Sequence, residues 1–132
     1  MVFRVALVVA LIATQAPNAQ NPTAASPEYG RSLFTFYCAS CHGRDARGRG
    51  PMAGALKIAP PDLTLLSRKY GGVFPSAILI SLLRDGDQSW VISHGSPEMP
   101  VWGPVLQRST DRELAEVRLQ SLVSYLRSIQ AK

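Results

Sequence analysis

The sequence predicts an all-α fold with a few helices in one domain. Apolar residues recur at helical spacing in two segments, 75–85 and 111–130, and no run alternates between apolar and polar residues as a half-buried strand would. The 132 residues are 46% hydrophobic and 17% charged, which is typical of a globular chain with one core. We therefore expect helices joined by Gly- and Pro-rich loops.

Residues 1–19 resemble a secretory signal peptide. Arg4 precedes a nine-residue apolar run, 5–13, and small and polar residues follow it. The run is far shorter than the roughly 20 apolar residues that span a bilayer, so we expect no stable membrane insertion. A buried core helix, the alternative, is disfavoured because prolines follow at once. We expect export with cleavage of this segment, a flexible leader at 20–27 and a folded domain at 28–132.

A first helix is predicted from residue 27 into the cysteine motif. Ser26 is a favoured N-cap residue, and Pro27 and Glu28 are favoured types in a first turn. Gly30 within the helix costs about 1 kcal/mol relative to Ala, so we expect a close helix contact there. The apolar face consists of Leu33, Phe34 and Tyr37.

The two cysteines form the motif C-x-x-C-H with His42. Two cysteines in an exported protein would normally suggest a disulfide. Here Cys38, Cys41 and His42 have the spacing of a haem attachment site, in which two thiols add to the haem vinyl groups and the histidine binds the iron. Residues three apart share one face of a helical turn, so both thiols can meet one haem edge while the next side chain lies under the ring.

Two other interpretations of the motif are weaker. A thioredoxin-like redox pair follows a strand in a βαβ unit, which the sequence does not show. A structural zinc site needs four ligands, and adjacent residues such as Cys41 and His42 suit one tetrahedral metal poorly, although His94 would complete the count. We therefore predict one covalent haem c, held by Cys38 and Cys41, with His42 as an axial ligand of its iron.

Two more helices are predicted after the motif. The segment 75–85 has a proline suited to its first turn, and Gly86 marks its end. The segment 111–130 is preceded by Thr110, which forms a capping box with Glu113. Its apolar stripe consists of Leu114, Val117, Ser121, Leu122, Tyr125, Leu126 and Ile129. The loop 44–61 is rich in glycine and proline, and we expect the haem to order it rather than its own hydrogen bonds.

Residues 29–130 resemble the class I c-type cytochromes, particularly the small single-haem bacterial ones. The shared pattern is an ordered set of motifs: a Gly and an aromatic residue before C-x-x-C-H, then His-Gly, Gly-Pro, Met-Pro and a closing amphipathic helix. They are matched by Gly30, Phe34, His42-Gly43, Gly50-Pro51, Met99-Pro100 and residues 111–130. The resemblance implies the cytochrome c fold, with helices wrapped around one haem and Gly30 in contact with the last helix.

The resemblance also implies that the Pro51 carbonyl accepts a hydrogen bond from the free ring nitrogen of His42. The alternative is that Pro51 only makes a turn. For the second axial ligand, Met99 is favoured, 57 residues after His42 and stiffened by a proline on either side. Met52, His94, water or an open site are the alternatives. Three aromatic residues could donate a hydrogen bond to a haem propionate, although we expect each of them to pack in the core by default. They are Tyr70, Trp90 and Trp102.

An iron with two protein ligands has no open position for a substrate, so we expect a carrier of single electrons rather than an enzyme. The first hypothesis is a periplasmic shuttle between a dehydrogenase or cytochrome complex and a terminal oxidase. The alternatives are an electron-transfer haem subunit of a larger oxidoreductase and a gas-binding haem with an open site. Despite a net charge of +5, no basic stripe interleaved with aromatics suggests nucleic acid. Three arginines could form a basic rim or an ordinary solvated loop: Arg44, Arg47 and Arg49.

Overall fold

The computed structural model describes residues 24–86, 99–107 and 112–132, and within these ranges it contains helices and no strand. The predicted all-α class is therefore confirmed. In chain order the elements are α1 (Pro27–Tyr37), α2 (Ala39–His42), the 3-10 turns η1 (Ala53–Ala55) and η2 (Leu63–Leu65), α3 (Leu66–Lys69), α4 (Ser76–Asp85), α6 (Gly103–Gln107) and α7 (Arg112–Ser128). The expected signal peptide and the residues Thr110, Trp90 and His94 lie outside the described ranges.

Helix α1 begins where its predicted cap places it. Ser26 has an extended backbone, and its Oγ accepts a hydrogen bond from the backbone N–H of Tyr29 at 3.2 Å. Pro27 occupies the first helical position, where a missing N–H costs nothing. Of the predicted apolar face, Leu33 and Phe34 are buried and Tyr37 is partly buried, and Gly30 is buried as well.

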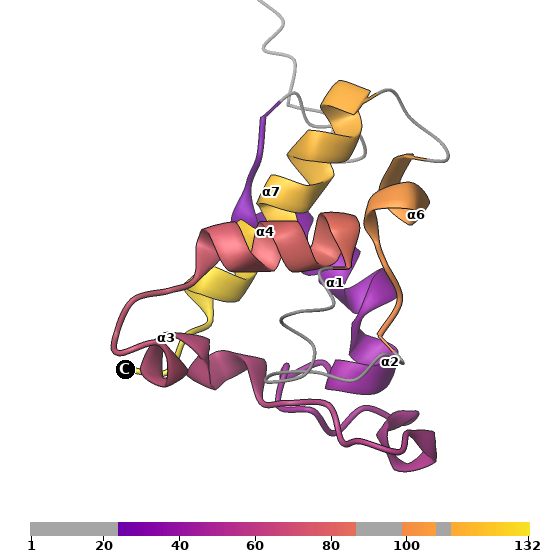
Figure 1. The fold of residues 1–132 in the computed structure, drawn as a ribbon, viewed down its shortest axis with the longest axis vertical. Coiled ribbons are helices and arrows are strands. Elements are labelled where there is room, and N and C mark those ends of the chain that lie inside the picture. The colour runs from indigo at the N-terminus through magenta and orange to yellow at the C-terminus, as the bar shows by residue number, and fades with distance from the viewer. Residues whose placement is uncertain (1–23, 87–98, 108–111) are drawn as a thin grey trace, which may run out of the picture.

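The two terminal helices, α1 and α7, pack against each other at the centre of the fold (Figure 1). A β-carbon at Gly30 would lie 2.8 Å from Cβ of Tyr125 and would overlap the backbone carbonyl of Ser121. The Phe34 and Tyr125 rings pack with their centroids 5.3 Å apart. The expected contact between Gly30 and the last helix is confirmed.

Helix α7 is buried on a wider face than the predicted stripe. Ser121, Leu122, Tyr125 and Leu126 of the stripe are buried. Three residues outside it are buried as well, namely Ala115, Leu119 and Val123. The reason is that α1, α4 and α6 all pack against α7, so more than one side of the helix is covered.

Helix α4 starts one residue later than its proline suggested, because Pro75 lies at the N-cap rather than in the first turn. It ends at Asp85, and Gly86 caps it in the left-handed region with φ 65°. Leu79 and Leu83 are its buried residues. Figure 1 shows α4 lying across α7, and the two helices are in contact.

The loop after α2 is held by its own hydrogen bonds, so the expectation that only the haem would order it is wrong. The backbone N–H groups of Gly48, Gly50 and Met52 donate to the carbonyls of the helix-α2 residues His42, Cys41 and Ser40, at 2.8, 3.0 and 2.9 Å. These carbonyls lie at a helix C-terminus, where they lack partners within the helix. The loop therefore satisfies the end of α2 while it folds onto it.

Candidate functional site

The residues of the C-x-x-C-H motif form one helical turn. Cys38 follows α1, and its carbonyl accepts hydrogen bonds from the N–H groups of Cys41 and His42 at 3.2 and 2.9 Å. Both cysteines are free thiols and are partly buried, while His42 is buried with 8% of its surface exposed. The structure thus brings the three predicted residues together on one rigid turn at the end of α1.

The Cys38 thiol is buried against ionisation. Burial raises the pKa of Cys38 to about 12, and the neighbouring Cys41 contributes to the rise. The uncharged hydroxyl of Ser40 donates a long hydrogen bond to Sγ of Cys41 at 3.9 Å. Dithiol exchange depends on a thiolate formed near neutral pH, and burial disfavours the thiolate of Cys38.

The imidazole of His42 is neutral at ordinary pH. Burial lowers the pKa of His42 below its usual value, and the nearby backbone carbonyl of Pro61 opposes part of that shift. No hydrogen bond of regular geometry reaches the buried Nδ1 atom within the described part of the chain. A neutral imidazole has a lone pair on one nitrogen, which a metal ligand needs, and an N–H on the other, from which a nearby carbonyl such as that of Pro61 can accept a hydrogen bond. The site therefore fits a haem whose iron takes His42 as a ligand.

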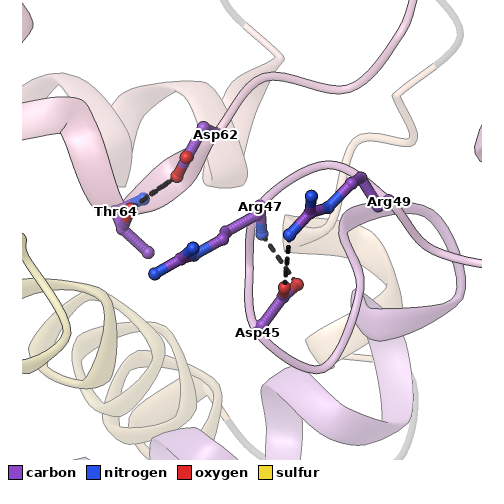
Figure 2. Close-up of polar contacts among 5 residues, drawn as sticks. All are labelled: Asp45, Arg47, Arg49, Asp62 and Thr64. Atoms are coloured by element: carbon purple, nitrogen blue, oxygen red, sulfur yellow. Dashed lines mark hydrogen bonds and ion pairs between the residues drawn. The ribbon is translucent and has the colours of Figure 1, made fainter.

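Pro61 is a neighbour of His42 that the sequence reasoning missed. Pro51, which was expected beside the imidazole, lies exposed on the turn after Gly50, and the carbonyl found beside the ring belongs to Pro61. The signal that could have found it is the Pro-Pro-Asp sequence before η2. Asp62 caps η2 by accepting from the N–H of Thr64 at 2.9 Å, and this cap fixes the backbone just after Pro61 (Figure 2).

The two described methionines that were candidates for the second axial position differ in burial. Met99 is partly buried and packs against the hydrophobic core, whereas Met52 is 52% exposed. A soft thioether in the core is better placed to face a buried group than one in solvent. His94 lies outside the described residues and cannot be compared with them.

The segment that carries Met99 is fixed to two helices. The N–H of Trp102 donates to the carbonyl of Leu83 in α4 at 3.0 Å, and the Trp102 ring packs on Tyr37 of α1 with centroids 5.5 Å apart. A β-carbon at Gly103 would clash with the backbone of Arg84. Tyr37 directly precedes Cys38, so these contacts tie the methionine segment to the start of the cysteine turn.

The loop after His42 contains a small ionic network, shown in Figure 2. Oδ1 of Asp45 accepts from the backbone N–H of Arg47 at 3.2 Å, and Oδ2 pairs with the Arg49 guanidinium at 3.3 Å. The Arg47 N–H and the Arg49 charge hold the pKa of Asp45 below its usual value. Asp45 is therefore ionised at neutral pH, and the side chain of Arg47 points away from it.

Two further properties of the described residues bear on the site. No three His, Cys, Asp or Glu side chains in residues 24–86, 99–107 and 112–132 come together as ligands for a bare metal ion. Within the same ranges, no helix has the length and apolar character to cross a bilayer. The zinc interpretation of the motif thus finds no ligand cluster in the part of the chain that the structure describes.

Comparison with known proteins gives one family and one curated relative. Residues 25–126 match the family model described as cytochrome c oxidase, cbb3-type, subunit III. The Cbb3-type cytochrome c oxidase subunit CcoP of Azospirillum brasilense is 29% identical over 98 residues, which are 74% of this chain and 29% of the relative. The chain thus spans less than a third of the length of the relative that it matches. No solved structure matches it.

Proposed function

Because the chain belongs to the cbb3-type cytochrome c oxidase subunit III family of cytochrome c domains, we propose that it is the electron-transfer haem unit of an oxidase-type complex. The observation that carries the proposal is the buried, neutral His42 on the same turn as the thiols of Cys38 and Cys41. The relative is an oxidase subunit, which favours a complex over a free periplasmic shuttle. The shuttle stays a second candidate because the chain resembles only a part of that relative.

In the proposed site, Cys38 and Cys41 hold the haem through two thioether bonds and His42 binds its iron. When bound, the haem supplies the one-electron change between ferric and ferrous iron. A carbonyl beside the imidazole, from Pro61 or from Pro51, orients the ring and raises its basicity as a ligand. The short α2 turn, closed by the hydrogen bonds from the loop, keeps the thiols and the imidazole in fixed positions.

Met99 is the proposed second axial ligand. It is packed against the core, and its segment is held by the contacts of Trp102 with Leu83 and Tyr37. A segment fixed at this point loses little conformational entropy when its thioether binds. Two protein ligands exclude substrate from the iron, which suits electron transfer rather than catalysis by this chain.

Export to the periplasm completes the proposal. Residues 1–19 have the pattern of a cleaved signal peptide, and covalent haem attachment at C-x-x-C-H is typical of exported cytochromes. The partners would then be redox proteins on the same side of the membrane: an electron donor and the oxidase or cytochrome complex that accepts the electrons.

The proposal is tested by purifying the native holoprotein under mild conditions and extracting it with acid and acetone. Haem that stays with the denatured chain supports attachment through Cys38 and Cys41, and haem lost to the solvent would refute it. Stable co-elution with an oxidase subunit supports the complex. A monomer that elutes alone, with its haem attached, would transfer the assignment to the free shuttle.

A further inference from the structure

Positive charge in this protein is concentrated in residues 43–70. This segment contains six basic and two acidic residues, whereas the rest of the chain contains eight basic and seven acidic ones. The segment therefore carries +4 of the formal net charge of +5. Figure 1 shows it along one end of the molecule, between α2 and α3, while α6 and the start of α7 lie at the other end. The protein is thus electrostatically asymmetric.

Three arginines project from the first turn of this segment. Arg44, Arg47 and Arg49 are all exposed, with 72% of the Arg49 side chain open to solvent. Asp45 is the acidic residue among them, and its exposed pairing with Arg49 is a weak interaction in water. Residues 44–49 therefore keep a net charge of +2.

The arginines are fixed to the haem-binding turn. Hydrogen bonds from Gly48 and Gly50 join the loop to the carbonyls of His42 and Cys41 at 2.8 and 3.0 Å. On the other side, the N–H of Leu63 donates to the carbonyl of Ala46 at 2.8 Å and so ties the loop to η2. Because the backbone is already ordered, little entropy is lost when its side chains meet a partner.

An exposed apolar residue follows these arginines in the same loop. Met52 is 52% exposed, and its N–H donates to the carbonyl of Ser40 at 2.9 Å, directly on α2. Arginine and methionine are enriched at protein–protein interfaces, whereas a surface that binds phosphates alone needs no exposed thioether. The combination favours a protein partner over a lipid or nucleic acid surface.

We infer that residues 44–52, which we call the basic loop, are a docking surface for an acidic electron-transfer protein. The inference rests on the proposed function, because it is the haem at Cys38 and Cys41 that makes contact at this loop useful. Carboxylates of the partner would pair with Arg44 and Arg47 and place its redox centre beside α2. The charge steers the encounter and raises the association rate at low salt.

The test uses the reduced holoprotein and two small oxidants of opposite charge, hexacyanoferrate(III) and tris(phenanthroline)cobalt(III). The double variant Arg44→Glu/Arg47→Glu reverses the basic loop but keeps the pairing of Arg49 with Asp45. At 10 mM salt, the reaction of the variant with hexacyanoferrate should be about tenfold slower and that with the cobalt complex faster. At 300 mM salt the variant and the wild type should agree, because screening removes the effect.

The matched control is Arg31→Glu/Arg112→Glu, which changes the net charge equally at exposed positions of α1 and α7. Unchanged rates in the control support a local docking surface, and an equal slowing of the control would overturn it.

Binding to soluble polyglutamate should also be lost in the Arg44→Glu/Arg47→Glu variant. Stronger binding to phosphatidylglycerol vesicles than to polyglutamate would overturn the protein partner in favour of a membrane. A wild type that reacts with neither oxidant contradicts the proposed function, whereas rates independent of salt contradict the docking surface alone.

Discussion

Gly30→Ala tests the contact between the terminal helices on which the haem site depends. An ideal Cβ at position 30 would lie 2.5 Å from the carbonyl carbon of Ser121 and 2.8 Å from Cβ of Tyr125. Carbon atoms in contact lie about 3.5 Å apart or more, so α1 and α7 would have to separate by about 1 Å. Two of the three nearest atoms belong to the backbone of α7, which cannot rotate away as a side chain can.

The size of the effect follows from two opposing terms. Alanine in place of glycine stabilises an exposed helix by about 1 kcal/mol. Overpacking a core usually costs about 1–3 kcal/mol, and a shift of two whole helices lies at the upper end or beyond. The separation of the helices would also loosen the Phe34–Tyr125 ring contact and the hydrogen bond from the backbone N–H of Ser26 to Oγ of Ser121. We expect a net loss of about 2 kcal/mol, which corresponds to a fall in Tm of roughly 8–16 °C for a domain of this size.

The measurement is thermal and guanidinium unfolding of the holoprotein, followed by circular dichroism at 222 nm. Gly54→Ala is the matched control, because a β-carbon at Gly54 would meet nothing within 4 Å. This control should stay within about 0.5 kcal/mol of the wild type. Equal stability of the two variants would refute the close packing of α1 on α7. The haem should remain attached in both, since neither glycine contacts the thiols.

The remaining predictions concern the iron, the cap of α1 and the basic loop. In the oxidised holoprotein, Met99→Ala should abolish the weak near-infrared sulfur-to-iron band and lower the reduction potential of the haem. Met52→Ala and His94→Ala should keep the band. If the band is instead lost in Met52→Ala, the second axial ligand is Met52 and not Met99. Ser26→Ala should lower the free energy of unfolding by about 1 kcal/mol, measured by guanidinium titration, and no change would contradict the cap. Asp45→Asn should speed the hexacyanoferrate reaction at low salt, and an unchanged rate would count against a local charge effect.

The sequence was sufficient for the elements whose signals are local. Ser26 before Pro27 predicts the start of α1, and Gly86 predicts the end of α4, because caps and stops act within one turn. The C-x-x-C-H spacing predicts the helical turn of the thiols for the same reason. The contact of Gly30 with α7 is not local, and it came from the family resemblance rather than from periodicity.

The short elements could not be predicted in this way. η1, η2, α3 and α6 have three to five residues each, which is too few for an apolar period to repeat. They form because other segments hold them. Gln130, for example, accepts from the N–H of Ser67 at 2.8 Å and donates to the carbonyl of Leu63 at 2.9 Å, so the end of the chain fixes η2 and α3.

The carbonyl of Pro61 beside His42 also depends on distant contacts, whereas the resemblance to class I cytochromes implied the carbonyl of Pro51. Pro51 is close to His42 in sequence, but the N–H groups of Gly50 and Met52 are used to bind the turn of α2, and this leaves Pro51 facing solvent. The chain then returns through Pro61, whose position depends on Asp62, on η2 and on the bonds from Gln130. If the Pro61 carbonyl orients the iron ligand in the holoprotein, its geometry is set by residues almost seventy positions away, which no local pattern in the sequence encodes.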